Sequence, residues 1–187
     1  MIETFTEFLK FVSDYLIKGM SVSILLMIIV KLVFKNKLDL STKIVKWIIL
    51  VYSFGVLLNT VLLYAFPIEK YAFLERATGP YAWAYWLMFS LNAMLPFVLL
   101  YHKPGRNLYL LFTISLLMNI GWLFESFVVH ASGLHRNFIT ADYNPYLPNE
   151  FELRVILSGF LLGIMLLVLE TIAGNINPEM RKTNQMQ

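Results

Sequence analysis

The feature that most constrains the fold is a series of long apolar runs separated by short polar loops. Each run has the roughly 20 apolar residues that an α-helix needs to cross a bilayer. Hydrophobic residues make up 58% of the 187 residues and charged residues only 14%, against about a quarter charged in ordinary soluble domains. We therefore predict an all-α, polytopic membrane helix bundle that lies in a lipid bilayer. Its expected transmembrane helices number about five: Tyr15–Phe34, Trp47–Phe66, Tyr81–Tyr101, Leu108–Val129 and Leu153–Ile172.

The segments outside these runs give the expected boundaries and topology. Residues 1–14 alternate acidic and apolar side chains, which is typical of an amphipathic segment at the membrane surface. Residues 15–173 form the expected bundle, and residues 174–187 form a polar tail. Lysine and arginine are concentrated around Lys35–Lys46 and Lys103–Arg106. The positive-inside rule then predicts that these loops and the C-terminus are cytoplasmic and that the N-terminus is outside.

The stretch Glu75–Leu100 combines a turn, an aromatic run and an apolar helix with polar positions. Proline lacks an N–H, so we expect Gly79-Pro80 to turn the chain and start a helix. The tyrosines and tryptophans that follow are typical of the headgroup level. Pro96 cannot donate to the carbonyl of Asn92, four residues earlier, so the sequence predicts a local kink and a polar spot there.

Two polar residues near helix ends and one pair of glycines predict how the helices begin, end and pack. Ser41 is a plausible N-cap of the second span, and Glu170 is expected to be a solvated helix end. Gly159 and Gly163 form a small-xxx-small pattern that permits close approach of another helix.

Glu125 is the strongest candidate for chemistry, because it lies about one turn inside the outer end of the fourth run. An intramembrane carboxylate commonly relays protons or contacts a ligand, so Glu125 is our candidate catalytic residue. The alternative is a structural ion pair with Arg76, Arg136 or Arg154 near the interface, which the sequence leaves open.

Three asparagines lie on three different runs. Asn59, Asn92 and Asn119 could line a path for protons or a quinone headgroup. They could equally form interhelical hydrogen bonds, which is the commoner use of such residues. Arg76, His135 and Arg136 lie in the outer loops, where contacts to partner subunits concentrate. His135 and Arg136 could also hold a carboxylate or carry protons.

The residue inventory restricts the redox chemistry. The chain has no cysteine, which excludes thiolate-bound iron–sulfur clusters, covalently attached haem and disulfides. Its histidines all lie at or beyond expected helix ends, so we expect no metal site and no cofactor bound by this chain alone. The net charge of +3 is small, and the basic residues are typical of topology signals rather than of nucleic-acid binding. Redox centres would then belong to partner subunits or to a diffusible quinone.

Three blocks, ERATGPYAWAYWLMFSLNAMLP, NIGWLFESFVV and SGLHRNF, carry a family resemblance in their order and spacing. They resemble the C-terminal half of the NrfD/polysulfide-reductase-type membrane subunits, most closely the quinone-binding ActC-like subunit of alternative complex III. The resemblance covers about residues 42–172. It implies a bacterial inner (cytoplasmic) membrane subunit that works beside iron–sulfur/molybdopterin-type and multihaem cytochrome c subunits, with menaquinol as the natural quinol.

The departures from that family limit what can be transferred. Family members hold their quinol-site His and Asp in an N-terminal bundle that these 187 residues do not contain, and the family's Glu-Arg pair is Glu125-Ser126 here. We therefore expect a membrane subunit of a quinol-oxidising respiratory complex with no activity alone. The alternatives are a scaffold or assembly subunit of another envelope complex, and a small-solute or proton transporter.

Overall fold

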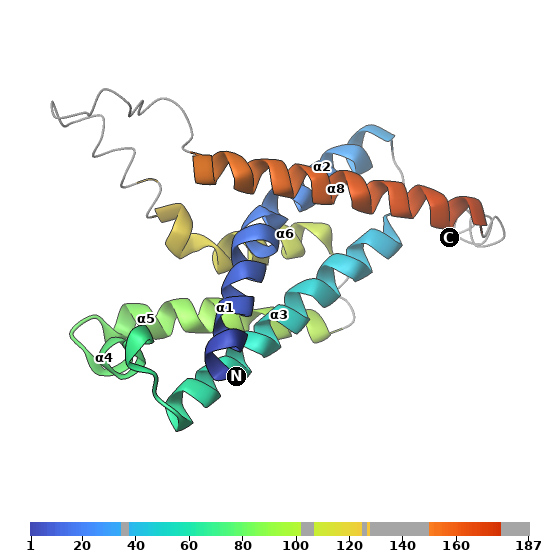
Figure 1. Cartoon of the computed structure of the whole chain (residues 1–187). Helices are drawn as coiled ribbons and strands as arrows, with labels where there is room; N and C mark the ends of the chain where they lie inside the picture. The colour runs from blue at the N-terminus through green and yellow to red at the C-terminus, as the bar shows by residue number, and fades with distance from the viewer. Residues whose placement is uncertain (35–37, 102–106, 125–126, 128–149, 177–187) are drawn as a thin grey trace, which may run out of the picture.

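The computed structural model describes residues 1–34, 38–101, 107–124, 127 and 150–176 of the chain. All regular secondary structure in these ranges is helical (Figure 1). The elements labelled α are α-helices, η1 and η3 are short π-helical segments, and η2 and η4 are 3-10 helices. In chain order they are α1 (Ile2–Val12), η1 (Ser13–Ile17), α2 (Lys18–Phe34), α3 (Asp39–Ala65), η2 (Glu69–Tyr71), α4 (Phe73–Thr78), α5 (Ala82–Phe89), η3 (Ser90–Met94), η4 (Leu95–Leu100), α6 (Leu108–Met118) and α8 (Glu150–Ile176).

Four helical stretches in the described ranges are long and apolar enough to cross a membrane: Ile2–Phe34, Asp39–Ala65, Ala82–Leu100 and Glu150–Gly174. At most 39% of the apolar window of any of them is buried within the protein. Most of their apolar surface therefore faces outward, where lipid replaces a protein core. The predicted all-α membrane bundle is confirmed.

The expected fourth span differs from the others because it is interrupted. α6 ends at Met118, Asn119 forms a turn, and residues 120–124 are helical again. The 11 residues of α6 rise about 16 Å, which is well short of the ~30 Å of a hydrocarbon core. The span therefore depends on what stabilises the break at Asn119.

The first helix is longer than expected. Residues 1–14 and the first span, expected as separate segments, belong to one helical stretch, Ile2–Phe34. Its 33 residues extend for about 50 Å, well beyond the hydrocarbon thickness. Its N-terminal part packs on α3, where a Cβ added to Gly55 would lie 2.9 Å from Cδ2 of Leu9.

The most extensive packing in the bundle is between α2 and α8, which cross in Figure 1. A Cβ added to Gly19 would lie 2.8 Å from the backbone N of Gly159, and one added to Gly163 would lie 3.2 Å from Cα of Ser23. Only glycine leaves room for backbones this close. Ser23 Oγ donates to the Gly159 carbonyl at 2.6 Å. The close approach predicted for Gly159 and Gly163 is confirmed.

α3 begins earlier than expected, and its start is held from another helix. The helix begins at Asp39, so Ser41 lies inside the first turn and is not the N-cap. Glu170 of α8 accepts hydrogen bonds from the Ser41 N–H at 2.7 Å and from the Ser41 hydroxyl at 2.9 Å. A carboxylate there satisfies N–H groups that a helix start leaves unpaired. The expectation that Glu170 is a solvated helix end was wrong.

In the part of the chain that the structure describes, two clusters of buried apolar side chains form the core. The larger one lies between α2, α3, α6, η4 and α8, and includes Met20, Ile24, Ile49, Leu99 and Leu111. The smaller one, Leu63, Phe73 and Ala77, joins the end of α3 to α4. Gly79-Pro80 forms the turn after α4, but α5 begins at Ala82, so the proline lies before the helix rather than in its first turn.

Candidate functional site

The break at Pro96 exposes a backbone carbonyl that another helix uses. The third span changes there from the π-helical η3 to the 3-10 helix η4. Pro96 has no N–H to donate, and the Asn92 carbonyl instead accepts the Ser53 hydroxyl of α3 at 3.0 Å. The polar spot predicted at this position is confirmed.

The side chain of Asn92 joins η3 to the end of α6. Its Nδ2 donates to the Met118 carbonyl at 2.9 Å, and Met118 is the last residue of α6, where helix carbonyls lack partners within the helix. Oδ1 of Asn92 and Oγ of Ser115 are buried and have no hydrogen-bond partner among the described residues. This part of the core is polar, and only some of its hydrogen-bonding groups have a partner among the described residues.

Asn119 joins α6 to the first helix. Its Nδ2 donates to the Ile17 carbonyl at 3.1 Å and to the Ser115 carbonyl at 2.9 Å, and the residue is only 5% exposed. Ile17 ends the π-helical segment η1. The break in the fourth span is therefore held by hydrogen bonds from the Asn119 side chain to backbone carbonyls of α6 and of the first helix.

Asn59 lies apart from the other two asparagines. Its Oδ1 accepts the Thr6 hydroxyl at 2.8 Å, which links α3 to α1. Asn92 and Asn119 meet around Met118, whereas Asn59 lies six residues, or about 9 Å along α3, from Ser53. Each asparagine thus makes a hydrogen bond between helices. A path for protons or a quinone headgroup along them stays a prediction.

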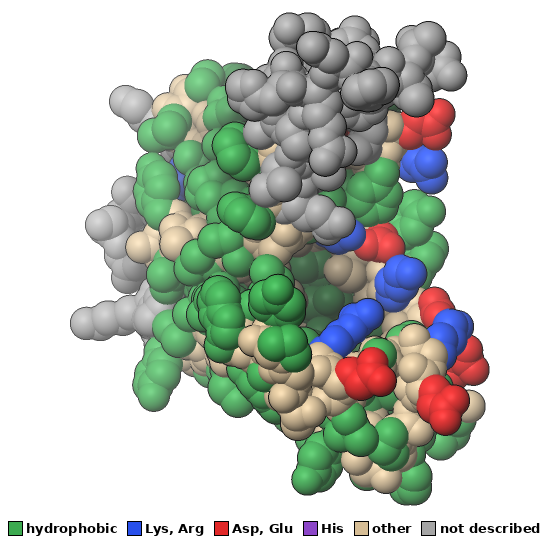
Figure 2. All heavy atoms as spheres, turned by 90° about the vertical axis from the view of Figure 1, so that its left-hand side faces the viewer, with side chains coloured by type: hydrophobic (Ala, Val, Ile, Leu, Met, Phe, Trp, Pro, Cys, Tyr) green, Lys and Arg blue, Asp and Glu red, His purple; other side chains and the backbone are tan. Residues whose placement is uncertain are grey.

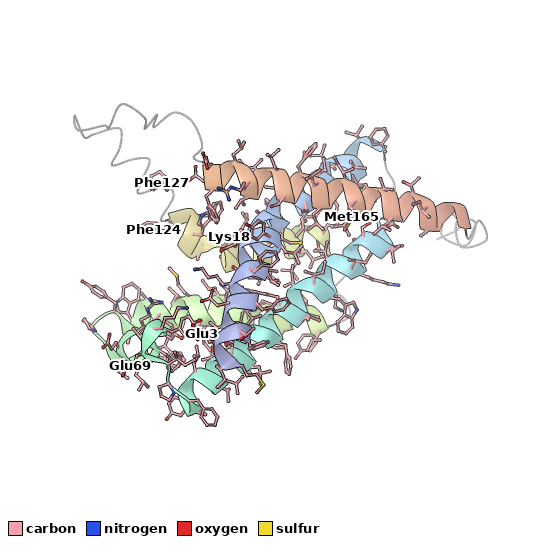
Figure 3. The ribbon with its side chains drawn as sticks, viewed as in Figure 1. Glu3, Lys18, Glu69, Phe124, Phe127 and Met165 are labelled. Atoms are coloured by element: carbon pink, nitrogen blue, oxygen red, sulfur yellow. The ribbon has the colours of Figure 1, made fainter. Side chains whose placement is uncertain are left out.

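A second polar cluster lies where η1 meets the start of α8. Lys18 Nζ bonds to Asp14 Oδ1 at 2.7 Å, and the lysine side chain is only 18% exposed. The same ammonium lies 4.6 Å from the ring centroid of Phe151 and 5.8 Å from that of Trp122, within reach of a cation–π interaction. In Figure 3 Lys18, which belongs to the first helix, lies near the segment that carries Phe124 and near the start of α8.

A small pocket of about 120 Å³ adjoins this cluster, lined by Asp14, Tyr15, Phe151 and Arg154. Within the described ranges Arg154 makes one long contact, 3.4 Å from its Nη2 to Glu150 Oε2. Sequence reasoning missed this site because Asp14 and Phe151 are far apart in the chain. The available signal was the i,i+4 spacing of Asp14 and Lys18, which predicts an ion pair on one helix face.

A third group of charges joins the N-terminus to the segment between α3 and α4. Lys70 Nζ lies 2.8 Å from Glu3 Oε1 and 3.1 Å from Glu7 Oε1. These hydrogen bonds raise the pKa of Lys70 above its ordinary value. The Tyr71 hydroxyl donates to Glu7 at 3.0 Å, and desolvation, followed by this bond, raises the tyrosine pKa. Figure 2 shows acidic and basic side chains gathered beside a hollow in this face.

The remaining candidates are placed only in part. Arg76 lies in α4 and is exposed, as a partner contact requires. Glu125, His135 and Arg136 lie outside the described residues. Within the described ranges no three His, Asp or Glu side chains come together as a metal site would need.

The comparisons with known proteins add no relative. No protein-family model, no curated protein and no solved structure matches this chain.

Proposed function

We propose that this chain is a membrane subunit of a quinol-oxidising respiratory oxidoreductase complex, similar to alternative complex III. In this proposal it lies in a bacterial inner membrane with its N-terminus outside and its C-terminus in the cytoplasm. It works beside iron–sulfur/molybdopterin-type and multihaem cytochrome c subunits. The family resemblance of the sequence blocks is the basis of the proposal.

One structural observation supports it: the first two blocks, separated in sequence, pack together. Trp86 Nε1 donates to the Ala77 carbonyl at 3.0 Å within the first block. Asn92 Nδ2 reaches the carbonyl of Met118, which directly precedes the second block. Gly121 of the second block lies against Met88 of the first, since an added Cβ would meet the methionine sulfur. Residues that carry the resemblance thus build one common region of the bundle.

The chemistry of the side chains supports a role that depends on partners. A chain without cysteine cannot supply thiolate ligands for a cluster, so electrons from a quinol must pass to centres on other subunits. The asparagines of the spans are engaged in hydrogen bonds between helices. The chain therefore acts chiefly as an anchor and organiser, with menaquinol as the proposed substrate of the assembly and Glu125 as the proposed proton acceptor.

Purification in a gentle detergent tests the proposal. The expected result is a complex with multihaem cytochrome and iron–sulfur partners, identified by haem absorption and mass spectrometry, that oxidises a menaquinol analogue. Co-purification with haem-free envelope proteins would instead indicate a scaffold or assembly subunit and would contradict the proposal. Solute or proton transport by the isolated chain in liposomes would contradict it as well.

A further inference from the structure

We propose that the pocket between η1 and the start of α8 binds the headgroup of an ethanolamine phospholipid. The pocket is the one lined by Asp14, Tyr15, Phe151 and Arg154. This inference goes beyond the proposed function and does not depend on which partners the chain has.

The position of the pocket supports a lipid ligand. On the first helix, residues 19–30 carry no charged side chain after Lys18, and on α8 residues 155–169 carry none after Arg154. Of these two last charges before a long apolar stretch, Arg154 lines the pocket and Lys18 bonds to Asp14, which also lines it. Such a boundary marks the level of the lipid headgroups, where Lys and Arg commonly anchor a helix.

The charges of the pocket match a phosphate joined to a primary ammonium. Arg154 has five N–H donors and, among the described residues, one long contact, to Glu150, so its guanidinium can bind a phosphate through two parallel hydrogen bonds. Asp14 Oδ1 accepts from Lys18, while no described residue donates to its Oδ2. That oxygen can accept a hydrogen bond from an ammonium group. The acidic side chain also disfavours headgroups with a net negative charge.

The pocket is large enough for a lipid headgroup but not for the whole lipid molecule. Its volume of about 120 Å³ is below the ~300 Å³ at which pockets begin to enclose drug-sized molecules. The acyl chains would therefore lie outside it. Leu153, Ile156 and Leu157 follow on α8 and are 48%, 45% and 52% exposed, which gives those chains an apolar surface.

Binding of lipids to the unmodified protein is the first test. The protein is placed in nanodiscs with equal amounts of phosphatidylethanolamine, phosphatidylcholine and phosphatidylglycerol, and the retained lipids are measured by native mass spectrometry. We expect about tenfold preference for ethanolamine over choline, because a quaternary ammonium cannot donate the hydrogen bond to Asp14. Equal retention of the three lipids, or a preference for phosphatidylglycerol, would overturn the proposal. So would binding of soluble phosphoethanolamine without retention of the lipid.

Substitutions in the pocket provide the second test. Arg154→Gln removes the phosphate contact and should strongly lower the amount of phosphatidylethanolamine retained, and Arg154→Lys should restore only part of it, because lysine lacks the paired donors. Lys43→Gln, at an exposed cation of α3, is the matched control and should leave the retained amount unchanged. Melting temperatures in detergent report whether each variant is folded. Unchanged retention of phosphatidylethanolamine by folded Arg154→Gln would contradict the assignment, and the lipid series on the unmodified protein decides the question if the variant does not fold.

Discussion

Glu170 of α8 holds the first turn of α3 through Ser41, whose backbone N–H and hydroxyl both donate to its Oε2, at 2.7 and 2.9 Å. The Leu166 carbonyl lies 2.9 Å from the same hydroxyl and is an alternative acceptor for its one proton, and the Leu40 N–H donates to Oε1 of Glu170 at 3.3 Å, so the two helices are joined at more than one point. The capping group of α3 is thus supplied by a residue far away in the sequence. The contact fixes the position of α8 along its own axis relative to the start of α3.

Glu170→Ala should destabilise the bundle by about 1 kcal/mol, the usual effect of removing a helix cap. The reason is that the N–H of Ser41 loses its acceptor. Unfolding in mixed micelles, followed by circular dichroism, measures the change. Thr171→Ala is the control, because among the described residues the Thr171 hydroxyl bonds only to Leu167 of its own helix. Equal losses in the two variants would show that the contact to α3 has no special role.

Gly159→Ala should destabilise the protein by about 1–3 kcal/mol, as overpacking of a close contact does. The new methyl group would lie 2.9 Å from Cβ of Val22 and would also press on the backbone of Gly19. Gly174→Ala is the matched control, since no atom of the described residues lies within 4 Å of a Cβ at that position. Thermal unfolding in detergent compares them. If both variants melt alike, α2 and α8 are not as close in the membrane as they are here.

Asn119→Leu should cost more stability than Asn92→Leu. Loss of Asn119 removes two hydrogen bonds, to the Ile17 and Ser115 carbonyls, whereas loss of Asn92 removes one, together with an oxygen that has no partner among the described residues. The expected loss for Asn92→Leu is about 1 kcal/mol or less, in the range of interhelical hydrogen bonds in membranes. Urea or SDS unfolding ranks the two variants, and the reverse order would contradict the hydrogen-bond assignments.

Lys70→Met should loosen the N-terminal turn without lowering the melting temperature appreciably, because exposed ion pairs contribute little to global stability. Amide hydrogen exchange of residues 2–8 should increase, and added salt should have the same effect on the unmodified protein by screening.

The pKa of Lys70 is raised in the folded protein, so the stabilisation that its charge gives to the N-terminal turn is fully present below the ordinary pKa of 10.5. It is lost only as pH rises through the folded-state pKa. Exchange protection attributable to this lysine should therefore persist from neutral to mildly alkaline pH, after correction for intrinsic exchange. Insensitivity to salt would argue against the ion pairs.

Glu125→Gln should slow quinol oxidation by the assembled complex at least about tenfold, since general acid–base groups typically contribute a hundredfold or more. Stopped-flow or steady-state turnover with a menaquinol analogue measures the effect. Glu69→Gln, at an exposed carboxylate of η2, is the control. Normal turnover by a fully assembled Glu125→Gln complex would exclude a role in proton transfer.

The sequence predicted those parts of the fold that depend on local pattern. Long apolar runs located the spans because helix length and hydrocarbon thickness are linked. Gly159 and Gly163 predicted a close contact because only small residues allow one. Pro96 predicted a free carbonyl at Asn92, although the sequence did not identify Ser53 as the donor.

Features that depend on two distant segments could not be predicted. The hydrophobicity of residues 108–129 concealed the break at Asn119, because that break is stabilised by the Ile17 carbonyl about a hundred residues earlier. Glu170 was expected in solvent because its acceptor role requires Ser41, which lies 129 residues away. The pocket at Asp14 was missed for the same reason, since Phe151 and Arg154 come from another helix.

The contact of Ser23 with Gly159 joins positions 136 residues apart, which has a consequence for biosynthesis. While the ribosome is still translating the middle of the chain, α2 has already entered the bilayer without its counterpart, and its glycine-serine face is open to lipid. Until α8 emerges, that glycine-serine face of α2 has to be shielded by the translocon or by an insertion chaperone. A nascent chain arrested before α8 is made should therefore crosslink to such a factor through position 23, and release should follow once α8 is inserted.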